Sequence, residues 1–426
     1  MVKSYDVVVA GAGPAGAAAA CVLAGRGASV ALVDRAAHPR PKLCGGLLTA
    51  KTVEALARIF GLTVADLTAL TDRTALTDRT ALTDRTGGGG LFHSTPEYLF
   101  LHQGRVLLRG IAAESFHFVD RPALDALLVS CAVARGAEYL PGRAVASCDA
   151  ASGLVRLQGG EEFSGRFVIG ADGANSVTRR ALGPAGFDRA AQRAIWQRNL
   201  AAAIEVELSV GVGPGQFPRQ VAVPELHVGG TSVPGAGYGW VFPGPNGPKV
   251  GICGLRRAER DVPGGREFKA IFLDFLRLLG VPEPEGVPLH GHPLPYGNAL
   301  KRPASGRLLL AGDAGGFVEP LFGEGIFYAL ATGAHAASAV LHGLTAGEAA
   351  AASEYERLLT RTVRPELVWS NRLRWVLFGA MTHFGVGPIR GFVGCAPAAL
   401  AQMVHGRRSF KLLARKTWDW GEGVGA

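Results

Sequence analysis

The sequence predicts an α/β fold in which a Rossmann-like dinucleotide-binding unit is combined with a second, β-rich region and a helical C-terminal region. Three observations lead to this fold class. Residues 5–35 contain an apolar strand, a glycine-rich turn, an alanine-rich helix and a second strand, in that order. Residues 201–255 are rich in strand-forming residues, and the last 85 residues have a mostly helical pattern.

The first strand–turn–helix unit has the features of a phosphate-binding turn. Gly11 permits a tight turn after the strand, Gly13 allows a pyrophosphate to approach the backbone, and Gly16 allows the helix to pack closely. Pro14 lies in the first helical turn, where a backbone N–H would have no partner within the helix. Asp34 ends the second strand and can accept a hydrogen bond from a ribose hydroxyl. These residues predict a dinucleotide site without deciding between FAD and NAD.

Composition and charge exclude several classes of protein. A hydrophobic content of 48% and a charged content of 19% indicate a folded chain of 426 residues, long enough for two or three domains. The net charge is +9, but most of the chain has no dense Lys/Arg run with interleaved aromatic residues, so no nucleic acid partner is expected. The six cysteines form no CxxC pair, which argues against a metal site and favours a reducing, cytoplasmic compartment. We expect neither a signal peptide nor a membrane-spanning helix.

The rest of the chain is predicted from its periodicity and its Gly/Pro positions. The hexapeptide TALTDR occurs three times after residue 67, and we interpret residues 68–86 as a surface insertion, with partner binding or regulation as the alternative. Helices are expected over residues 51–61, 121–134 and 327–341. Strands are expected within residues 97–108, in a meander over 137–168, and within 306–316.

Three glycine-containing segments far apart in the chain together resemble a known cofactor-binding set. They are GAGPAG (residues 11–16), GADGANSVTRR (170–180) and LLLAGDAGG (308–316). This set resembles the FAD-binding motifs of the flavoprotein hydroxylase-like superfamily, which favours FAD over NAD. The resemblance implies that Asp172, Gly173 and Arg179 support the pyrophosphate region and that Asp313 hydrogen-bonds the ribityl chain. The alternative is that Asp172 and Asp313 are only turn-forming acids.

Tyr238, Trp240 and Phe242 alternate along a predicted strand that ends at Pro243, so their rings point to one face. The stretch YGWVFPGPNGPKVG (residues 238–251) resembles the YxWxFPxxxxxxVG pattern of the geranylgeranyl reductase family. The resemblance implies a substrate pocket for an isoprenoid chain, lined by Tyr238, Trp240, Phe242 and Pro243. A plain β-sheet core explains one or two of these aromatic residues, and three on one face also suit a pocket.

The loop PKLCGG (residues 41–46) resembles the cysteine-bearing loop of the same family, placed beside the flavin. Transfer of hydride to an unactivated C=C bond needs a proton at the neighbouring carbon, and a thiol that stays neutral at pH 7 can hold that proton. We therefore expect Cys44 to be the catalytic residue, with an ordered water as the other source of the proton. The alternative is that Cys44 is a small apolar residue packed against the ring. The other five cysteines are expected to be structural.

The loop GGFVEPLFGEGI (residues 315–326) resembles the one whose backbone N–H groups face the pyrimidine edge of the flavin, where such donors stabilise negative charge. The full cofactor-binding set implied by the resemblance is Gly11, Gly13, Pro14, Ala15, Gly16, Asp34, Arg35, Cys44, Gly45, Arg121, Asp172, Gly173, Arg179, Gly312, Asp313, Pro320, Gly323, Glu324, Gly325 and Ile326.

The resemblance implies an FAD-dependent reductase that saturates C=C bonds of a polyprenyl lipid, quinone or pigment precursor. A flavin-dependent monooxygenase or halogenase, and a membrane-associated flavoprotein that passes electrons to quinone, are the alternatives. No second strand–GxGxxG–helix unit is present, so we expect NAD(P)H bound transiently, or a ferredoxin-like carrier, as electron donor. The expected domains are an FAD-binding domain (1–48, 100–185 and 290–345), a substrate-binding domain (49–99 and 186–289) and a helical C-terminal region (346–426).

The C-terminal region is basic and aromatic. Between Leu367 and Trp418 the chain has no Asp or Glu and eight basic residues: Arg372, Arg374, Arg390, Arg407, Arg408, Lys411, Arg415 and Lys416. Seven aromatic residues lie among them. This pattern predicts either a surface that lies on anionic lipid at the inner face of a membrane or a solvated basic face over an ordinary helical core.

Overall fold

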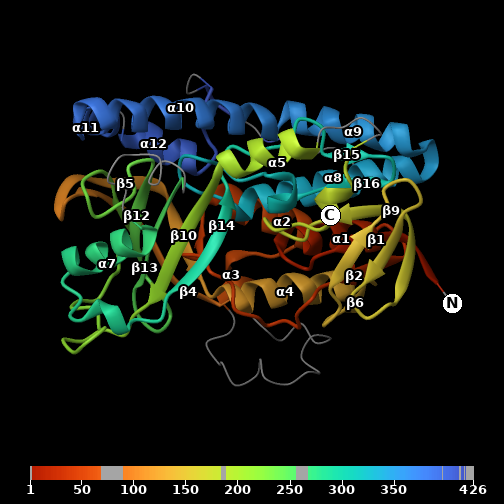
Figure 1. Ribbon diagram of the computed structural model, residues 1–426, viewed down its shortest axis with the longest axis horizontal. Coiled ribbons are helices and arrows are strands. Elements are labelled where there is room, and N and C mark those ends of the chain that lie inside the picture. Colours follow the sequence, from red (N-terminus) through yellow and green to blue (C-terminus); the bar gives the residue numbers. More distant parts are fainter. Residues whose placement is uncertain are drawn as a thin grey trace.

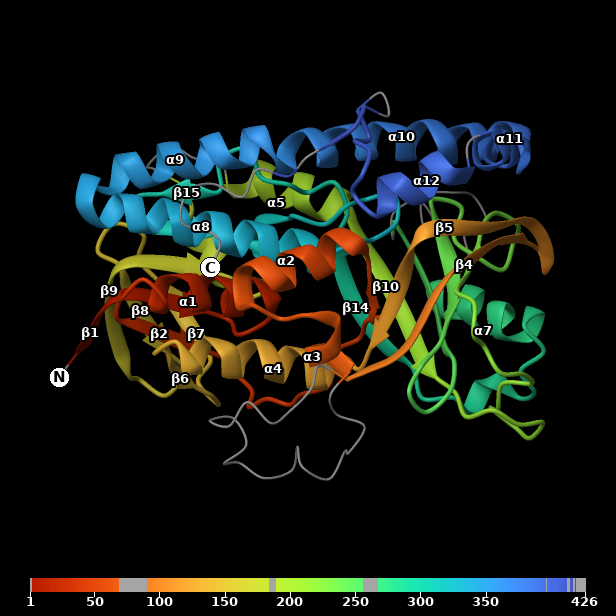
Figure 2. The ribbon, with the colours of Figure 1, turned by 180° about the vertical axis from the view of Figure 1, so that it is seen from behind.

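The computed structural model describes residues 2–68, 90–183, 189–255, 267–395, 397–411, 414–416 and 418. Apart from Thr68, the TALTDR repeat lies outside these residues. Two sheets lie side by side, with the helices from α8 to α12 forming a layer along one side of both (Figure 1; Figure 2). The predicted α/β class with a helical C-terminal region is therefore confirmed.

The first sheet has a parallel core that contains both strands of the predicted dinucleotide-binding unit. β1 (Lys3–Ala10) lies between β2 (Val30–Val33) and β9 (Glu162–Gly170), and all three are parallel. The outer parallel strands are β6 (Glu138–Leu140) and β16 (Leu308–Leu310). Antiparallel additions at the edges are β15 (Ala304–Ser305), β7 (Val145–Cys148) and β8 (Leu154–Leu157). Such parallel sheets need helices over their faces, because both faces are apolar.

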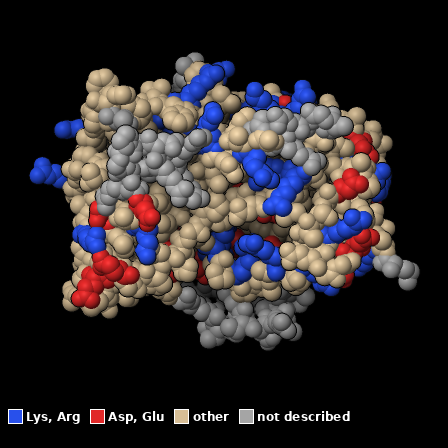
Figure 3. Space-filling view, in the orientation of Figure 1, with Lys and Arg blue, Asp and Glu red and all other residues tan. Residues whose placement is uncertain are grey.

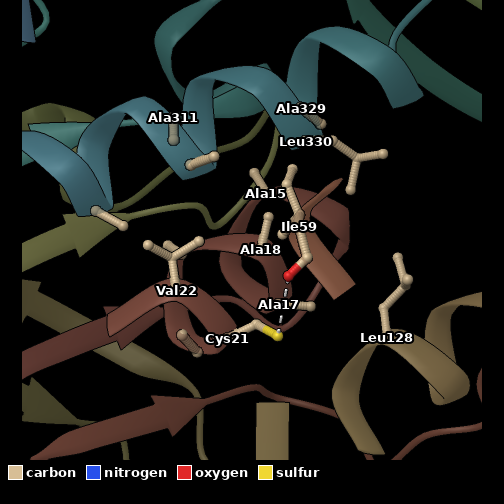
Figure 4. Packing of buried hydrophobic residues seen from close by; sticks show 14 of the residues in the cluster. Ala15, Ala17, Ala18, Cys21, Val22, Ile59, Leu128, Ala311, Ala329 and Leu330 are labelled. Carbon is tan, nitrogen blue, oxygen red and sulfur yellow. Dashed lines mark hydrogen bonds between the residues drawn. The ribbon is translucent and has the colours of Figure 1, made fainter. Parts of the chain in front are cut away.

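α1 (Pro14–Ala24) and α8 (Ile326–Ala346) supply much of that cover and pack closely against each other. Small side chains make the close approach feasible: a Cβ on Gly333 would lie 2.1 Å from the carbonyl oxygen of Ala15. Figure 4 shows the alanines of α1 beneath Ala329 and Leu330 of α8. Ile59 of α2 (Ala50–Phe60) and Leu128 of α4 (Arg121–Ala134) flank them, and the Cys21 thiol contacts the Ile59 carbonyl oxygen at 3.8 Å.

The second sheet has the strand order β14–β10–β13–β12–β11–β4–β5–β3 and is antiparallel except between β11 and β4. Its strands are β14 (His290–Pro295), β10 (Leu200–Glu207), β13 (Lys249–Leu255), β12 (Gly237–Phe242), β11 (Glu225–His227), β4 (Leu91–His102), β5 (Arg105–Val119) and β3 (Leu47–Leu48).

Three ranges expected in the FAD-binding domain contribute strands to this second sheet, and one of these strands is β3, which pairs with β5. β5 pairs with β4 in a long hairpin, and β14 pairs with β10. Which sheet a strand joins depends on long-range pairing that local sequence does not encode. The hairpin is also longer than the two short strands expected within residues 97–108.

The remaining helices are α3 (Val64–Thr68), α5 (Arg189–Arg198), α7 (Phe268–Leu278), α9 (Glu348–Arg361), α10 (Val363–Phe384), α11 (Gly387–Cys395) and α12 (Pro397–Val404). α10 and α9 extend along the outside of the molecule, and α12 packs on β5 (Figure 1). Within the described ranges, no helix combines the length and the apolar character needed to cross a bilayer.

His405, just after α12, fixes this helical layer to α2. Its Nδ1 accepts a hydrogen bond from the N–H of Ala50 at 3.1 Å, and its ring packs on Phe116 with centroids 4.5 Å apart. Burial lowers the pKa of His405 to about 4. The unfolded chain binds a proton at this residue below pH ~6.5, whereas the folded chain resists protonation down to about pH 4.

We therefore predict that His405 contributes to stability above pH ~6.5 and that this contribution is lost as the pH falls toward 4. The decrease in Tm between pH 7.5 and 5 should be smaller in His405→Gln than in the wild type. His342→Gln, at an exposed histidine of α8, is the control and should keep the full decrease. An equal decrease in all three proteins would contradict the assignment.

Candidate active site

The fold brings the three glycine-containing segments to one edge of the first sheet. Ala10 at the end of β1 pairs with Gly170 at the end of β9, and Gly170 pairs with Leu310 at the end of β16. The three strands are parallel, so their carboxyl ends lie at the same edge, where α/β sheets bind ligands. The segments that follow these strands are those predicted to hold the cofactor.

Each of the three glycines of the first turn is suited to its position for a different physical reason. Gly11 has φ +101°, and a Cβ there would lie 2.4 Å from the carbonyl oxygen of Ala171. A Cβ on Gly16 would lie 1.8 Å from the carbonyl oxygen of Gly11. At Gly13, by contrast, no atom lies within 4 Å of the position of a Cβ. Gly11 and Gly16 are therefore required by the fold itself, whereas the space beside Gly13 is open for a ligand.

Asp34 stabilises this turn from the end of β2. Its carboxylate accepts hydrogen bonds from the N–H of Ala12 at 2.7 Å and of Ala36 at 2.9 Å, and Arg40 lies 3.5 Å away. A carboxylate has about four acceptor positions, so these contacts leave capacity for a sugar hydroxyl. A polar hollow of about 630 Å³ lies next to it, bordered by Arg35, Gly142 and Gln158 among others.

Asp172, in the second segment, is occupied within its own turn. One carboxylate oxygen accepts from the hydroxyls of Ser176 and Thr178 at 2.6 and 2.7 Å, and the other accepts from the N–H groups of Val177 and Thr178 at 2.7 and 3.0 Å. Asp172 thus shapes the turn, which includes Gly173 at φ +80°. Any support that it gives to a cofactor acts through the backbone.

Arg179 ties the second segment to the third. Its guanidinium donates to the carbonyl oxygens of Ala174 at 3.0 Å and Ala314 at 3.1 Å, and it lies 3.6 Å from the centre of the Trp196 ring. Burial lowers the pKa of Arg179 to about 10, so the side chain stays positively charged at pH 7. This charge lies beside the predicted pyrophosphate region.

Asp313 lies in a 3-10 turn (Gly312–Gly315) directly after β16. The turn is held by Thr332, whose hydroxyl accepts from the N–H of Gly312 at 2.9 Å. Burial raises the pKa of Asp313, and the positive charges of Lys42 and Arg121 act against this rise. The charges that act on Asp313 therefore come from other segments, whereas Asp172 is hydrogen-bonded within its own turn, and this difference suits Asp313 better for a role toward a ligand.

The loop before α8 has fewer free N–H groups than predicted. The N–H of Gly323 donates to the Glu319 carbonyl oxygen at 3.0 Å, and the N–H groups of Leu321 and Phe322 donate to the Glu319 carboxylate, each at 2.7 Å. Further N–H donors at this place lie in the first turn of α8, which begins at Ile326 after the N-cap Gly325. Gly323 instead provides space: its φ is +71°, and a Cβ would lie 2.8 Å from the hydroxyl oxygens of both Tyr238 and Tyr296.

Glu324 and Pro320 belong to the same loop but have structural contacts. The Glu324 carboxylate accepts from the Thr49 hydroxyl at 2.9 Å and forms an ion pair with the nearly inaccessible Lys51 at 2.5 Å. Pro320 is buried. These contacts fix the loop to the start of α2.

The cysteine-bearing loop lies against Arg121, the first residue of α4. The Arg121 guanidinium forms a buried ion pair with Asp125 at 2.9 Å and also interacts with the Cys44 side chain. Burial by itself lowers the pKa of Arg121, but the charge of Asp125 and the contact with Cys44 raise it overall. Cys44 is half-buried, and its sulfur accepts a weak hydrogen bond from the N–H of Gly46 at 3.4 Å. A permanent positive charge is thus placed beside the thiol.

One apolar cavity of about 200 Å³ joins these parts. Its walls contain Cys44 and Gly45, the segment from Gly323 to Ile326, and all three predicted aromatic residues, Tyr238, Trp240 and Phe242. Pro243 ends β12 and does not line it. A Cβ on Gly45 would lie 2.5 Å from the Phe242 ring, so the cysteine-bearing loop is packed directly on the aromatic strand. Phe118 packs behind Phe242 with centroids 5.7 Å apart.

Several lining residues gave no recognisable signal in the sequence. Tyr98, Phe100 and Phe116 come from the β4–β5 hairpin, and Leu400 and Val404 come from α12. Cys253, expected to be only structural, also lines the cavity. Its sulfur lies 3.2 Å from the Tyr296 hydroxyl, and burial raises its pKa to about 11, so it is a neutral thiol at pH 7.

Lys42, two residues before Cys44, brings a positive charge to the cysteine-bearing loop. Lys42 Nζ lies 2.7 Å from Nε2 of His292, and burial together with Lys42 lowers the pKa of His292 to about 4. The imidazole is therefore neutral and accepts from the ammonium group. Figure 3 shows a hollow near the middle of this face, between the two sheets, with lysine and arginine side chains around its rim.

A parallel sheet with a glycine-rich βαβ unit, joined to an antiparallel sheet that encloses an apolar cavity, defines a dinucleotide-dependent oxidoreductase of the flavoprotein type. The model of the family described as FAD binding domain matches residues 4–235, and the chain belongs to this family of FAD-dependent oxidoreductases. The predicted resemblance is therefore confirmed.

The relatives support this placement. A menaquinone reductase of Mycobacterium tuberculosis is 32% identical over 346 residues, covering 78% of this chain and 76% of that protein. A geranylgeranyl diphosphate reductase of Rhodobacter capsulatus is 29% identical over 353 residues, covering 81% and 77%. A solved geranylgeranyl bacteriochlorophyll reductase-like protein from Thermoplasma acidophilum has a TM-score of 0.67 at 19% identity, covering 88% and 87%. A solved halogenase structure has a TM-score of 0.64 at 17% identity, covering 94% of this chain and 82% of that chain. At these identities the two structures show the shared fold.

The residues present fit FAD. The N-terminus of α1 has no side-chain cap, so its N–H groups are available to a pyrophosphate beside the open position at Gly13. Asp34 retains acceptor capacity at the ribose end, and Asp313 lies further along the same edge, toward the cavity. The first turn of α8 then offers N–H groups where a flavin ring would meet the cavity.

Proposed function

We propose that this protein is an FAD-dependent reductase that saturates C=C bonds in a polyprenyl group carried by a lipid, a quinone or a pigment precursor. The observation that carries the proposal is the apolar cavity of about 200 Å³, in which the Cys44 loop, the N-terminal turn of α8 and the aromatic strand meet. Names of relatives at about 30% identity, menaquinone reductase and geranylgeranyl diphosphate reductase, support this substrate class.

The proposed division of roles follows from the contacts. The glycine turn, Asp34, Arg179 and Asp313 would hold the FAD, and when reduced it would supply a hydride. The Cys44 thiol would hold the proton for the neighbouring carbon. Loss of that proton leaves a thiolate, and the Arg121 guanidinium beside it would stabilise the negative charge. Asp125 keeps Arg121 in place.

The aromatic strand would orient the prenyl chain. Trp240 and Phe242 face the Cys44 loop, and Tyr238 is fixed by donating its hydroxyl to the Phe322 carbonyl oxygen. Tyr238 and Phe100 also line a second apolar hollow, of about 40 Å³, that continues toward α10–α12 and is bordered by Leu377, Phe378 and Phe392. A long tail would extend along this direction, because most of the residues that line both hollows are apolar.

Electrons would come from NAD(P)H bound transiently or from a ferredoxin-like carrier protein. The positive charge of Lys42, near the Cys44 loop, suits either an anionic nucleotide or an acidic carrier. Reduction rates of the bound flavin with each donor, measured by stopped-flow absorbance, distinguish them.

The function is tested with purified, dithionite-reduced protein and a panel of geranylgeranyl lipids and menaquinones. The expected product is heavier than the substrate by two mass units for each bond reduced. An unchanged panel with fully reduced flavin would contradict the proposal, and substrate-stimulated oxygen uptake would favour a monooxygenase instead.

We also propose that the protein binds peripherally to the inner face of an anionic membrane through α10. Not all the basic residues serve this surface: Arg374 is buried, Arg407 pairs with Glu54 and Glu114, and Lys416 pairs with Glu366. Exposed side chains remain on α10. Arg372 is exposed, and four apolar or aromatic residues of the same helix are 41–76% exposed, namely Val368, Trp375, Val376 and Phe384. Apolar residues mixed with arginine suit the boundary between headgroups and acyl chains.

The double variant Trp375→Ser/Phe384→Ser should therefore lose most co-sedimentation with vesicles containing phosphatidylglycerol. The matched control is Val106→Ser/Ile111→Ser, because these side chains are similarly exposed (57% and 71%) but lie on β5. Equal sedimentation of wild type, variant and control would contradict membrane binding through α10.

A further inference from the structure

Glu205 is a buried carboxylic acid that no sequence motif indicated. It lies on β10 with only 7% of its surface exposed. One carboxylate oxygen accepts from the backbone N–H of Cys44 at 3.1 Å, and the other accepts from the indole N–H of Trp240 at 3.1 Å. A single side chain thus joins the cysteine-bearing loop to the aromatic strand.

The position is an expensive one for an acid, which indicates a specific role. Burial raises the pKa of Glu205, while the charge of Lys249 and the two N–H donors act in the opposite direction. Lys249, on the neighbouring strand, is also only 7% exposed. Both carboxylate oxygens are used by donors, so a neutral or apolar replacement cannot satisfy both partners.

The cysteine-bearing loop and the aromatic strand also contact each other directly, apart from their shared hydrogen bonds to Glu205. Gly45 packs on the Phe242 ring, and the position of its missing Cβ is 3.7 Å from Nε1 of Trp240. Gly46 has φ +74°, and its missing Cβ would lie 2.3 Å from the Val119 carbonyl oxygen. The loop that carries Cys44 is therefore confined between β12 and β5, and Glu205 is its hydrogen-bonded anchor.

We propose that Glu205 is a positioning residue that fixes the Cys44 backbone and the Trp240 ring relative to each other. It thereby sets the thiol and the aromatic wall against the same carbon of the substrate. The effect of this positioning on catalysis rests on the proposed function. The positioning of Cys44 itself rests only on the hydrogen bonds of Glu205.

The test compares Glu205→Gln with Glu207→Gln in the FAD-loaded protein. Glu207 is two residues further on the same strand, is exposed, and accepts from the N–H of Asn246 at 2.9 Å, away from the cavity. An amide at position 205 turns one of the two hydrogen bonds into a contact between donors. The loop should then open more easily, and alkylation of Cys44 by iodoacetamide, followed on its peptide by mass spectrometry, should be faster by about tenfold.

The same variant should lower kcat with KM little changed, because the proton source moves while the apolar cavity remains. Glu207→Gln should match the wild type in both measurements. If Glu205→Gln does not fold, Glu205→Asp is used, since its shorter side chain cannot reach both partners. Unchanged alkylation of Cys44 in the folded Glu205 variant would overturn the proposal. Faster alkylation supports it even if no protein in the series reduces an alkene, in which case only the proposed function fails.

Discussion

Replacement of Cys44 by alanine is expected to lower kcat for alkene saturation by about 10²–10⁴-fold, the usual contribution of a general acid. The thiol lies in the wall of the cavity, beside the Arg121 guanidinium that would stabilise the thiolate. FAD content and Tm should remain close to those of the wild type, because a half-buried thiol contributes little to packing.

The matched control is Cys148→Ala. Cys148 is also half-buried but lies on β7 in the first sheet, away from the cavity. Its kcat should equal that of the wild type. If Cys44→Ala retains full activity, the alternative of a packing residue is correct and the proton comes from water.

Two glycines of the first turn should respond differently to the same methyl group. Gly16→Ala should destabilise even the cofactor-free protein by about 1–3 kcal/mol or more, because the new Cβ would overlap the carbonyl oxygen of Gly11. Gly13→Ala should leave the Tm of the cofactor-free protein unchanged, since its backbone is extended and its surroundings are open. It should instead weaken FAD binding by about tenfold or more, because the added methyl group would occupy the open space beside the turn and keep the pyrophosphate away from a backbone N–H. This is the loss expected for one charged hydrogen bond.

Calorimetry of the cofactor-free proteins and titration with FAD check these two outcomes separately. A decrease in Tm for Gly13→Ala equal to that of Gly16→Ala would show that both glycines serve only the fold. Normal FAD affinity in Gly13→Ala would place the pyrophosphate elsewhere.

The fold was predictable where local sequence carries it. The order of strand, glycine turn, helix and terminal acid in residues 5–35 is a property of neighbouring residues, and the same holds for the helix that begins at Arg121. The meeting of the Cys44 loop with Trp240 and Phe242 was implied only by a family resemblance, since nearly two hundred residues separate them. Which sheet β5 and β14 join depends on pairing at long range, which local sequence does not encode.

The chemical state of individual side chains was the least predictable part. Asp172 and Asp313 both follow strands and precede glycines, yet their surroundings differ. Asp172 accepts four hydrogen bonds within its own turn, whereas the charges of Lys42 and Arg121, from other segments, act on Asp313. The charge of the basic C-terminal surface was equally hard to predict, because Arg407 and Lys416 form ion pairs with acids far away in the sequence. Glu205 has no motif at all, and only its two partners reveal it.

The most direct test of the central claim is a single turnover without oxygen. The protein is reduced with one equivalent of dithionite per flavin and mixed with a geranylgeranyl lipid, while flavin absorbance and the lipid products are followed together. We predict that the flavin is reoxidised at the rate at which saturated product forms, with one C=C bond lost per flavin. Reoxidation without loss of an alkene, or reoxidation only when oxygen is admitted, would contradict the assignment of this protein as a prenyl reductase.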